Sequence, residues 1–284
     1  MNPDWLLPDW PAPSGVRAVF TTRQGGFSGV PFDSLNLGDH VGDAPEKVAA
    51  NRAALQSTIG SRPVFLKQVH GSQTLAIDAD TADGQLADAC VTRQRHIACT
   101  IMVADCLPVL LTTEDGSMVA AAHAGWRGLA GVGTDAGERA EQGGRAGRGV
   151  LEAVYESFSP LAQVIRAQPA MKIIAWLGPC IGPTAFEVGV EVKAAFELTQ
   201  PQASRFFVAT GRGKYRADLA GLARLRLQAL GVTDIYGNDS SPGWCTHSNP
   251  SRFFSHRRDA AVAGNGVGNG FGTTGRMAAA IWRI

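Results

Sequence analysis

Two histidines and a cysteine are the side chains of this sequence best suited to bind a metal ion or attack a substrate. They occur in three short peptides: KQVHG (67–71), ADCLP (104–108) and HAGWRG (123–128). Each peptide places its reactive side chain, His70, Cys106 or His123, at the end of an expected strand, where a rigid scaffold can present it. A His-Cys-His set gives zinc three protein ligands and leaves a fourth position for water, which is the pattern of catalytic zinc.

The spacing of these three residues leaves other interpretations open. No short C-x-x-C or H-x-x-x-H clip occurs, so only the folded chain could bring the ligands together. Without a metal, Cys106 could be a nucleophile, with His123 or His70 as its base. Asp105 or another acidic residue would then orient the base. In the plainest alternative, Cys106 is a buried apolar side chain and both histidines are hydrogen-bonded loop residues.

Copper is an alternative metal for the same ligands. A trigonal His-Cys-His set with a weak axial Met is the blue-copper pattern, and Met102 or Met118 could be that axial ligand. The six histidines of the chain are too few for a separate multi-copper cluster, which argues against multicopper-oxidase chemistry. The zinc-deaminase motif is also incomplete, because Cys180 lacks a second Cys at the required spacing and no H-x-E occurs.

Arginines could hold an anionic substrate. Arg23 lies beside two glycines, Arg127 lies in a glycine turn before an expected helix, and Arg257 and Arg258 lie in FFSHRRD. A guanidinium near the backbone N–H groups of a helix start suits a phosphate or a carboxylate. The alternative is that each arginine is solvated or forms a surface ion pair. Trp126 could stack on a base or anchor its loop.

The elements that must position these side chains alternate between strands and helices. Apolar runs predict strands over residues 16–22, 64–69, 74–77, 96–103, 107–113, 117–123, 171–177 and 276–284, although the alanines of the last segment would equally permit a helix. Helical spacing predicts helices over residues 45–60, 186–198 and 219–230. Glycine-rich stretches predict a loop or a helix extension over 131–149 and a loop over 260–275. The central strands scarcely alternate in hydropathy, which indicates sheets covered on both faces. We therefore expect an α/β (α+β) fold, with residues 1–284 forming one domain of mixed, layered β-sheets flanked by helices.

Composition excludes several classes of protein. The 284 residues carry a formal net charge of +1, which provides no broad basic field for nucleic acid or an anionic membrane. No apolar run reaches the roughly 18 residues of a membrane helix, and no signal peptide is evident. Five widely spaced cysteines do not resemble a secreted disulfide framework. We expect a cytoplasmic monomer that acts on a small molecule.

Seven ordered motifs resemble those of a known family. They are TTRQGGFS, SLNLGDHVGD, LKQVHG, ADCLPVLL, AAAHAGWRGLAG, GPCIGPTAFEVG and FFSHRRD…TGRMAAAIW. The sequence resembles the laccase-domain family, formerly called multicopper polyphenol oxidases and now regarded as purine nucleoside phosphorylases, over about residues 15–284. This resemblance implies zinc held by His70, Cys106 and His123. It also implies phosphorolysis of adenosine, inosine and methylthioadenosine, together with adenosine deamination. Polyphenol oxidation with copper and editing of peptidoglycan precursors are alternative activities attached to members of the family.

Two insertions and several secondary roles complete these expectations. Compared with the family pattern, residues 131–149 and 261–272 look like loop insertions that could reshape the mouth of the site and alter substrate preference. For phosphorolysis we expect Arg127 to hold phosphate together with Arg23 or the pair Arg257 and Arg258. Asp105 would donate a proton to the leaving purine. For deamination, the zinc would activate a water.

Overall fold

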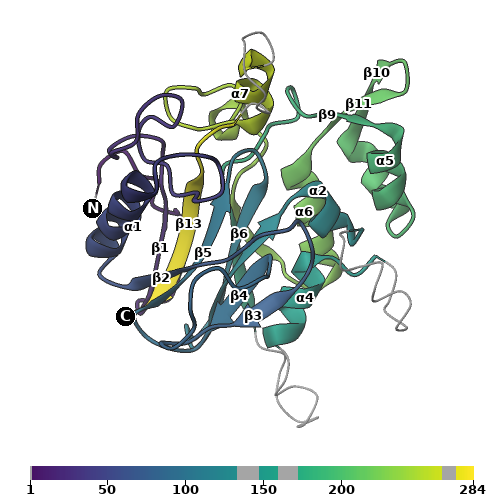
Figure 1. Ribbon diagram of the computed structural model, residues 1–284. Helices are drawn as coiled ribbons and strands as arrows, with labels where there is room; N and C mark the ends of the chain where they lie inside the picture. The colour runs from purple at the N-terminus through teal and green to yellow at the C-terminus, as the bar shows by residue number, and fades with distance from the viewer. Residues whose placement is uncertain (1, 133–146, 159–171, 264–272) are drawn as a thin grey trace, which may run out of the picture.

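The computed structural model describes residues 2–132, 147–158, 172–263 and 273–284 (Figure 1). The strands are β1 (Val16–Phe20), β2 (Arg62–Phe65), β3 (Thr74–Ala76), β4 (Ala89–Thr92), β5 (Ile97–Val103), β6 (Leu107–Thr113), β7 (Val119–Ala124), β8 (Ile173–Leu177), β9 (Glu187–Gly189), β10 (Phe207–Gly211), β11 (Lys214–Ala217), β12 (Asp234–Gly237) and β13 (Met277–Arg283). The helices are α1 (Pro45–Ile59), α2 (Trp126–Ala130), α4 (Val150–Phe158), α5 (Val190–Glu197), α6 (Leu219–Ala229) and α7 (His256–Ala263), with 3-10 turns η1 (Pro201–Phe206) and η2 (Pro242–Trp244).

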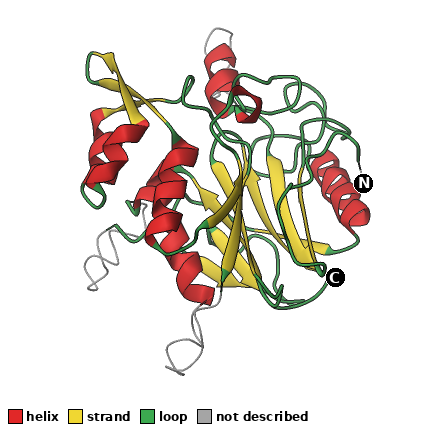
Figure 2. Ribbon diagram, turned by 180° about the vertical axis from the view of Figure 1, so that it is seen from behind, coloured by secondary structure: helices red, strands yellow, loops and turns green. Residues whose placement is uncertain are grey.

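Two mixed sheets pack face to face in the middle of the molecule. One sheet has the strand order β1-β13-β5-β2 and the other has the order β12-β8-β6-β7-β4-β3. Helix α1 covers the outer face of the first sheet, whereas α2, α4 and α6 cover the outer face of the second (Figure 1). The view from behind shows the same helix–sheet–sheet–helix order (Figure 2). The expected class, a mixed α/β fold with layered sheets flanked by helices, is confirmed.

The strands are apolar on both faces because both faces of each sheet are covered. In β5, Cys99 and Ile101 pack into the core between the two sheets, whereas Ala98 and Met102 pack towards α1. Strand β6 behaves in the same way, since Leu110 faces the first sheet and its neighbours face the helices. The lack of alternation in the sequence is therefore the signature of this double burial.

Most of the predicted elements are present. The predicted strands correspond to β1, β2, β3, β5, β6, β7, β8 and β13, and two predicted helices correspond to α1 and α6. Helix α1 ends as predicted, because Gly60 adopts the left-handed conformation (φ 63°) and its N–H donates to Gln56 O. Of the two predicted loops, residues 133–146 and 264–272 lie outside the described residues.

The helix predicted over residues 186–198 is wrong in its first turn. Residues Glu187–Gly189 form β9, because they pair with β11 and satisfy their backbone groups there. Together with β10, β9 and β11 make a small sheet that projects from the main body beside α5 (Figure 1). The helix α5 begins only after Gly189.

The sequence patterns also missed several short elements. The strands β4, β10, β11 and β12 and the helices α4 and α7 were not predicted. Helix α7 overlaps the loop predicted from residue 260, and it starts where Ser255 Oγ accepts a hydrogen bond from Arg258 N at 3.2 Å. No helix in the described part of the chain is long and apolar enough to cross a membrane.

Candidate active site

The three expected metal ligands converge where the chain passes between the two main sheets. His70 lies between β2 of the first sheet and β3 of the second, Cys106 lies between β5 and β6, and His123 belongs to β7. Their ligand atoms all lie within 4.8 Å of one another. Cys106 Sγ is 3.7 Å from His70 Nε2, and the two imidazole rings meet edge to face with centroids 4.7 Å apart. The packing of the two sheets therefore brings together three ligands that lie in separate segments of the sequence.

The distance between Cys106 and His70 matches the spacing of zinc ligands. A tetrahedral zinc with Zn–S of about 2.3 Å and Zn–N of about 2.05 Å separates the two ligand atoms by about 3.6 Å, and Cys106 Sγ lies 3.7 Å from His70 Nε2. The donor set, one thiolate and two imidazoles, is also one that zinc accepts. His70 is exposed, Cys106 is half-buried and His123 is buried, so the open side of the triad faces the surface.

Asp88 is a buried carboxylate that holds two of the ligands. Its Oδ1 lies 2.8 Å from His123 Nδ1, so Nδ1 carries the proton and Nε2 is left for the metal. The same oxygen accepts a hydrogen bond from His70 N at 2.8 Å, and Oδ2 accepts from Gly71 N at 2.7 Å and Val69 N at 3.2 Å. Sequence reasoning missed Asp88, whose one signal is an acidic residue directly before the buried strand β4.

Charges within the triad favour a metal-binding thiolate. Burial by itself raises the pKa of Cys106, but the neighbouring His123 and His70 lower it to about 6. Burial likewise lowers the pKa of His123, but the charge of Cys106 and the hydrogen bond to Asp88 raise it to about 9. The pair can also act without metal as a Cys–His nucleophile, and Asp88 then takes the orienting role that we expected of Asp105.

Gly125 is required by close packing against the triad. A Cβ added at Gly125 would lie 2.8 Å from His70 Cδ2 and 3.1 Å from Cys106 Sγ. Such contacts would push both ligands away, so a residue with a side chain cannot occupy this position without rearrangement of the site. The glycine in HAGWRG therefore preserves the geometry of the triad.

The triad opens into a cavity of about 280 Å³, near the lower limit of roughly 300 Å³ for small-molecule sites. The cavity is lined by His40, Gln68, His70, Met102, Val103, Ala104, Asp105, Cys106, His123, Trp126, Ile181, Phe186, Leu219, His256, Arg257 and Arg276. The lining combines apolar and aromatic side chains with two arginines, Arg257 and Arg276. The cavity can therefore take a ligand that has both a flat apolar portion and an anionic portion.

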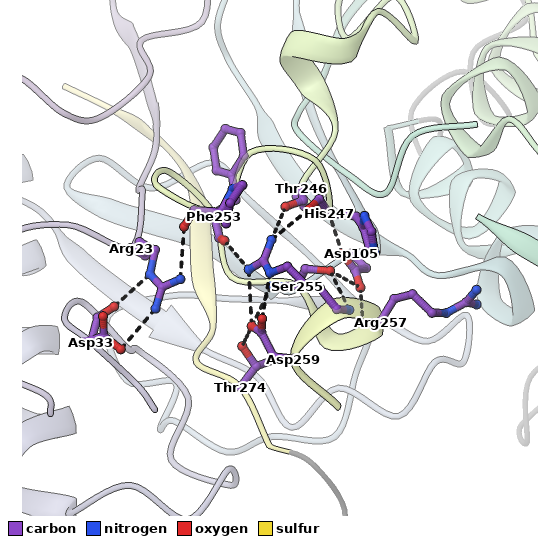
Figure 3. A network of polar contacts seen from close by, with 12 residues as sticks. Arg23, Asp33, Asp105, Thr246, His247, Phe253, Ser255, Arg257, Asp259 and Thr274 are labelled. Carbon is purple, nitrogen blue, oxygen red and sulfur yellow. Dashed lines mark hydrogen bonds and ion pairs between the residues drawn. The ribbon is translucent and has the colours of Figure 1, made fainter. Parts of the chain in front are cut away.

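Two of the four predicted arginines serve the fold instead of the cavity. Arg23 pairs with Asp33 at 3.1 Å (Figure 3) and donates to the backbone oxygen of Pro250. Arg258 pairs with Asp259 at 2.8 Å, and its remaining donors bind the backbone oxygens of residues 246, 247 and 253. Neither side chain lines the cavity, and their guanidinium donors are already used within the protein.

The other two predicted arginines lie closer to the site. Arg257 is an exposed residue at the edge of the cavity lining, where its guanidinium lies 5.8 Å from the Phe186 ring centroid and donates to Glu187 O at 3.1 Å. Arg127 is exposed and stacks on Trp126 with its guanidinium carbon 4.4 Å from the ring centroid. Trp126 lines the cavity but Arg127 does not. Arg276, which sequence reasoning missed, also lines the cavity, and its signal was the TGR of the last motif.

Asp105 is an acceptor of hydrogen bonds from three directions. Its Oδ1 accepts from Thr246 Oγ1 at 2.6 Å, and its Oδ2 accepts from Arg257 N at 2.6 Å and Ser255 Oγ at 3.0 Å (Figure 3). The backbone of Asp105 is left-handed (φ 87°), which brings its carboxylate under the start of α7. Asp105 thus ties the Cys106 turn to Arg257, and its role as proton donor stays a prediction.

The two methionines considered for copper lie in different places. Met102 lines the cavity beside the triad, where its sulfur is 3.9 Å from Arg52 Nη2. Met118 lies before β7, at the end of that strand opposite to His123, and it is buried in the core under the helices. Only Met102 is therefore near the three ligands.

Comparisons with known proteins give a consistent assignment. The sequence profile of the family described as "Multi-copper polyphenol oxidoreductase laccase" matches residues 17–284. The chain is 44% identical over 279 residues to "Purine nucleoside phosphorylase PA4543" of Pseudomonas aeruginosa, covering 98% of each chain. It is 42% identical over 281 residues to "Purine nucleoside phosphorylase YfiH" of Escherichia coli K12, again covering 98% of each.

Solved structures share the fold. The crystal structure of Neisseria meningitidis protein NMB0706 matches with a TM-score of 0.78 and 38% identity, and covers 99% of both chains. YlmD from Geobacillus stearothermophilus matches with a TM-score of 0.79 and 30% identity, over 98% of this chain and 96% of that one.

Proposed function

The chain belongs to the multi-copper polyphenol oxidoreductase laccase family, and from this premise we propose that it is a zinc-dependent purine nucleoside phosphorylase. Adenosine, inosine or methylthioadenosine would react with phosphate to give the free base and a ribose 1-phosphate. The names of the relatives from Pseudomonas aeruginosa and Escherichia coli support this activity. Adenosine deamination is the second activity that we propose for the same site.

One observation carries the proposal: the His-Cys-His triad opens into a cavity that is lined by both aromatic side chains and arginines. Trp126 and Phe186 offer flat apolar surfaces for a purine. Arg257 and Arg276 offer guanidinium groups for phosphate. A nucleoside and a phosphate ion need these two surfaces in one enclosed space.

The chain's own residues supply the remaining parts of phosphorolysis. A phosphate oxygen bonds to C1′ of the ribose as the C1′–N9 bond breaks, and the departing purine keeps the electron pair and takes up a proton. The arginines hold the attacking phosphate and balance its charge. His40 and His256 line the same cavity, and an imidazole there can pass a proton to the departing purine.

Zinc held by His70, Cys106 and His123 would supply a Lewis acid and an activated water. Hydrolytic removal of an amino group is chemistry that such a three-ligand site supports directly, which is our reason for including deamination. The thiolate state of Cys106 and the orientation of His123 by Asp88 support zinc as the resident metal.

Chromatography of adenosine reactions with and without phosphate tests the proposal. Zinc-loaded protein should release adenine only when phosphate is present, and His70→Ala and Cys106→Ala should reduce this release to background. The matched control is His96→Asn, which changes an exposed histidine outside the cavity and should retain full activity.

Other results of this assay would favour a different activity or a different role for the metal. Inosine without adenine would make deamination the main activity. Full phosphorolysis by a metal-free Cys106→Ala protein would overturn the role of zinc. No change in adenosine, despite bound zinc, would favour hydrolysis of a peptidoglycan precursor, and oxidation of a polyphenol by the copper-loaded protein would favour the oxidase.

A further inference from the structure

Arg276 is a half-buried arginine that forms no direct ion pair among the described residues, although the charges of Cys106 and Asp105 act on it from a distance. It directly precedes β13, and its side chain lines the cavity beside the triad. Its Nη1 donates to the backbone oxygens of Thr274 at 2.8 Å and Gly275 at 3.3 Å. Among the described residues, Nε and Nη2 have no hydrogen-bond partner, and no carboxylate lies within 4.0 Å of the guanidinium. A desolvated cation of this kind calls for an anionic ligand.

The protein fixes Arg276 at both its backbone and its side chain. Its N–H donates to Asn36 Oδ1 at 2.9 Å, and its C=O accepts from Leu37 N at 3.0 Å. A Cβ added at Gly38 would lie 2.7 Å from Arg276 Cγ, so the glycine makes room for the arginine stem. The SLNLGDH and TGR motifs are far apart in sequence, and the contacts between them fix the position of Arg276.

Arg257 is a second arginine among the residues that line the same cavity. Its backbone N–H donates to Asp105 Oδ2 at 2.6 Å (Figure 3), and its Nη1 donates to Glu187 O at 3.1 Å. The two arginines come from different elements, the first turn of α7 and the residue before β13. By contrast, Arg258 and Arg23 use their donors within the protein.

We propose that Arg276 binds the phosphate that attacks the nucleoside, with Arg257 as its partner. This inference rests on the proposed phosphorylase activity and deepens it by naming the residue that holds the anion. The ligand is a tetrahedral oxyanion, either inorganic phosphate or the phosphate group of the sugar phosphate product. A guanidinium with two free donor nitrogens can make a paired contact with two oxygens of such a group.

Steady-state kinetics of zinc-loaded Arg276→Met and Arg276→Lys test this role. We expect the KM for phosphate to rise about 10- to 100-fold in Arg276→Met, because charge-assisted hydrogen bonds are lost. Arg276→Lys keeps the positive charge but loses the paired N–H donors of the guanidinium, so its KM for phosphate should rise less. The KM for adenosine and the phosphate-independent deamination should change less than threefold. Arg252→Met, which removes an exposed cation outside the cavity, should match the wild type.

A binding measurement separates this inference from the proposed function. Inorganic phosphate should raise the melting temperature of the wild type and of Arg252→Met, but not that of Arg276→Met. If the wild type shows no phosphorolysis but this difference persists, the proposed function fails and the anion site stands. If phosphorolysis occurs and Arg276→Met keeps both its KM for phosphate and its thermal response, the inference is overturned. If Arg276→Met does not bind zinc, the KM for phosphate and the thermal response of Arg276→Lys test the inference in its place.

Discussion

At the scale of the residue, one carboxylate positions two of the three proposed metal ligands. Asp88 fixes the tautomer and orientation of His123 and holds the backbone of the turn that carries His70. Its own burial is tolerated because four hydrogen bonds satisfy its oxygens. Burial raises the pKa of Asp88, but the bonds to His123 and to backbone N–H groups outweigh that effect and lower it.

Asp88→Asn should weaken zinc binding about 10- to 100-fold, because outer-shell partners of metal-bound histidines have effects of that size. The amide would also place an N–H against backbone donors that need an acceptor. Competition with a chromophoric chelator measures the affinity. Asp80→Asn, which changes an exposed carboxylate, is the matched control and should bind zinc like the wild type. An unchanged affinity in Asp88→Asn would contradict the role assigned to this residue.

At the scale of the element, Asp259 joins the start of α7 to the segment before β13. Its carboxylate accepts hydrogen bonds from Ser255 N and Thr274 Oγ1 and pairs with Arg258. Burial by itself raises the pKa of Asp259, but these partners lower it below 3.8. Arg257 lies on α7 and Arg276 follows Thr274, so the contacts of Asp259 fix the segments that carry both cavity arginines relative to each other.

Stability should depend on pH through Asp259. Since its pKa is lower in the folded state, the ionised form adds stability that is complete above the unfolded value near 3.8 and is lost as the pH falls below it. Asp259→Asn should therefore lower the free energy of unfolding by about 1–2 kcal/mol at pH 7. Urea titrations between pH 7 and pH 3 should show the difference constant down to about pH 5 and shrinking below pH 4. A difference that grows towards low pH would contradict this account.

At the scale of the whole molecule, the triad joins the two main sheets. His70 and Cys106 lie on links that pass from the first sheet to the second, and His123 belongs to the second. A metal held by all three would fasten the sheets together at one end of the core between them. Metal binding and global stability should therefore be coupled.

Zinc should raise the melting temperature of the metal-free protein. At a free concentration 100 times the dissociation constant, binding adds about 2.7 kcal/mol, which corresponds to roughly 5–10 °C for a domain of this size. Differential scanning calorimetry measures the shift. It should vanish in Cys106→Ala and persist in His96→Asn, where asparagine suits the left-handed backbone of residue 96. Equal shifts in both variants would mean that zinc binds elsewhere.

The sequence by itself determined the components that depend on local patterns. Apolar runs indicated the central strands and their burial on both faces, because hydropathy period reflects which faces are covered. Gly60 indicated the end of α1, because a left-handed cap is a local requirement. His70, Cys106 and His123 were recognisable because few side chain types can ligate zinc, and their peptides also carried the resemblance to the family.

Only the tertiary structure decided which polar groups meet. Asp88 reaches His123, and Asn36 and Gly38 hold Arg276, through contacts between segments that are distant in the chain. Nothing in the local sequence distinguishes Arg257, which lines the cavity, from Arg258, whose guanidinium donors bind neighbouring backbone oxygens and Asp259. The short strand β4 likewise forms because a partner strand is present. Hydrogen-bond partners and short paired strands depend on long-range packing, which local propensity does not encode.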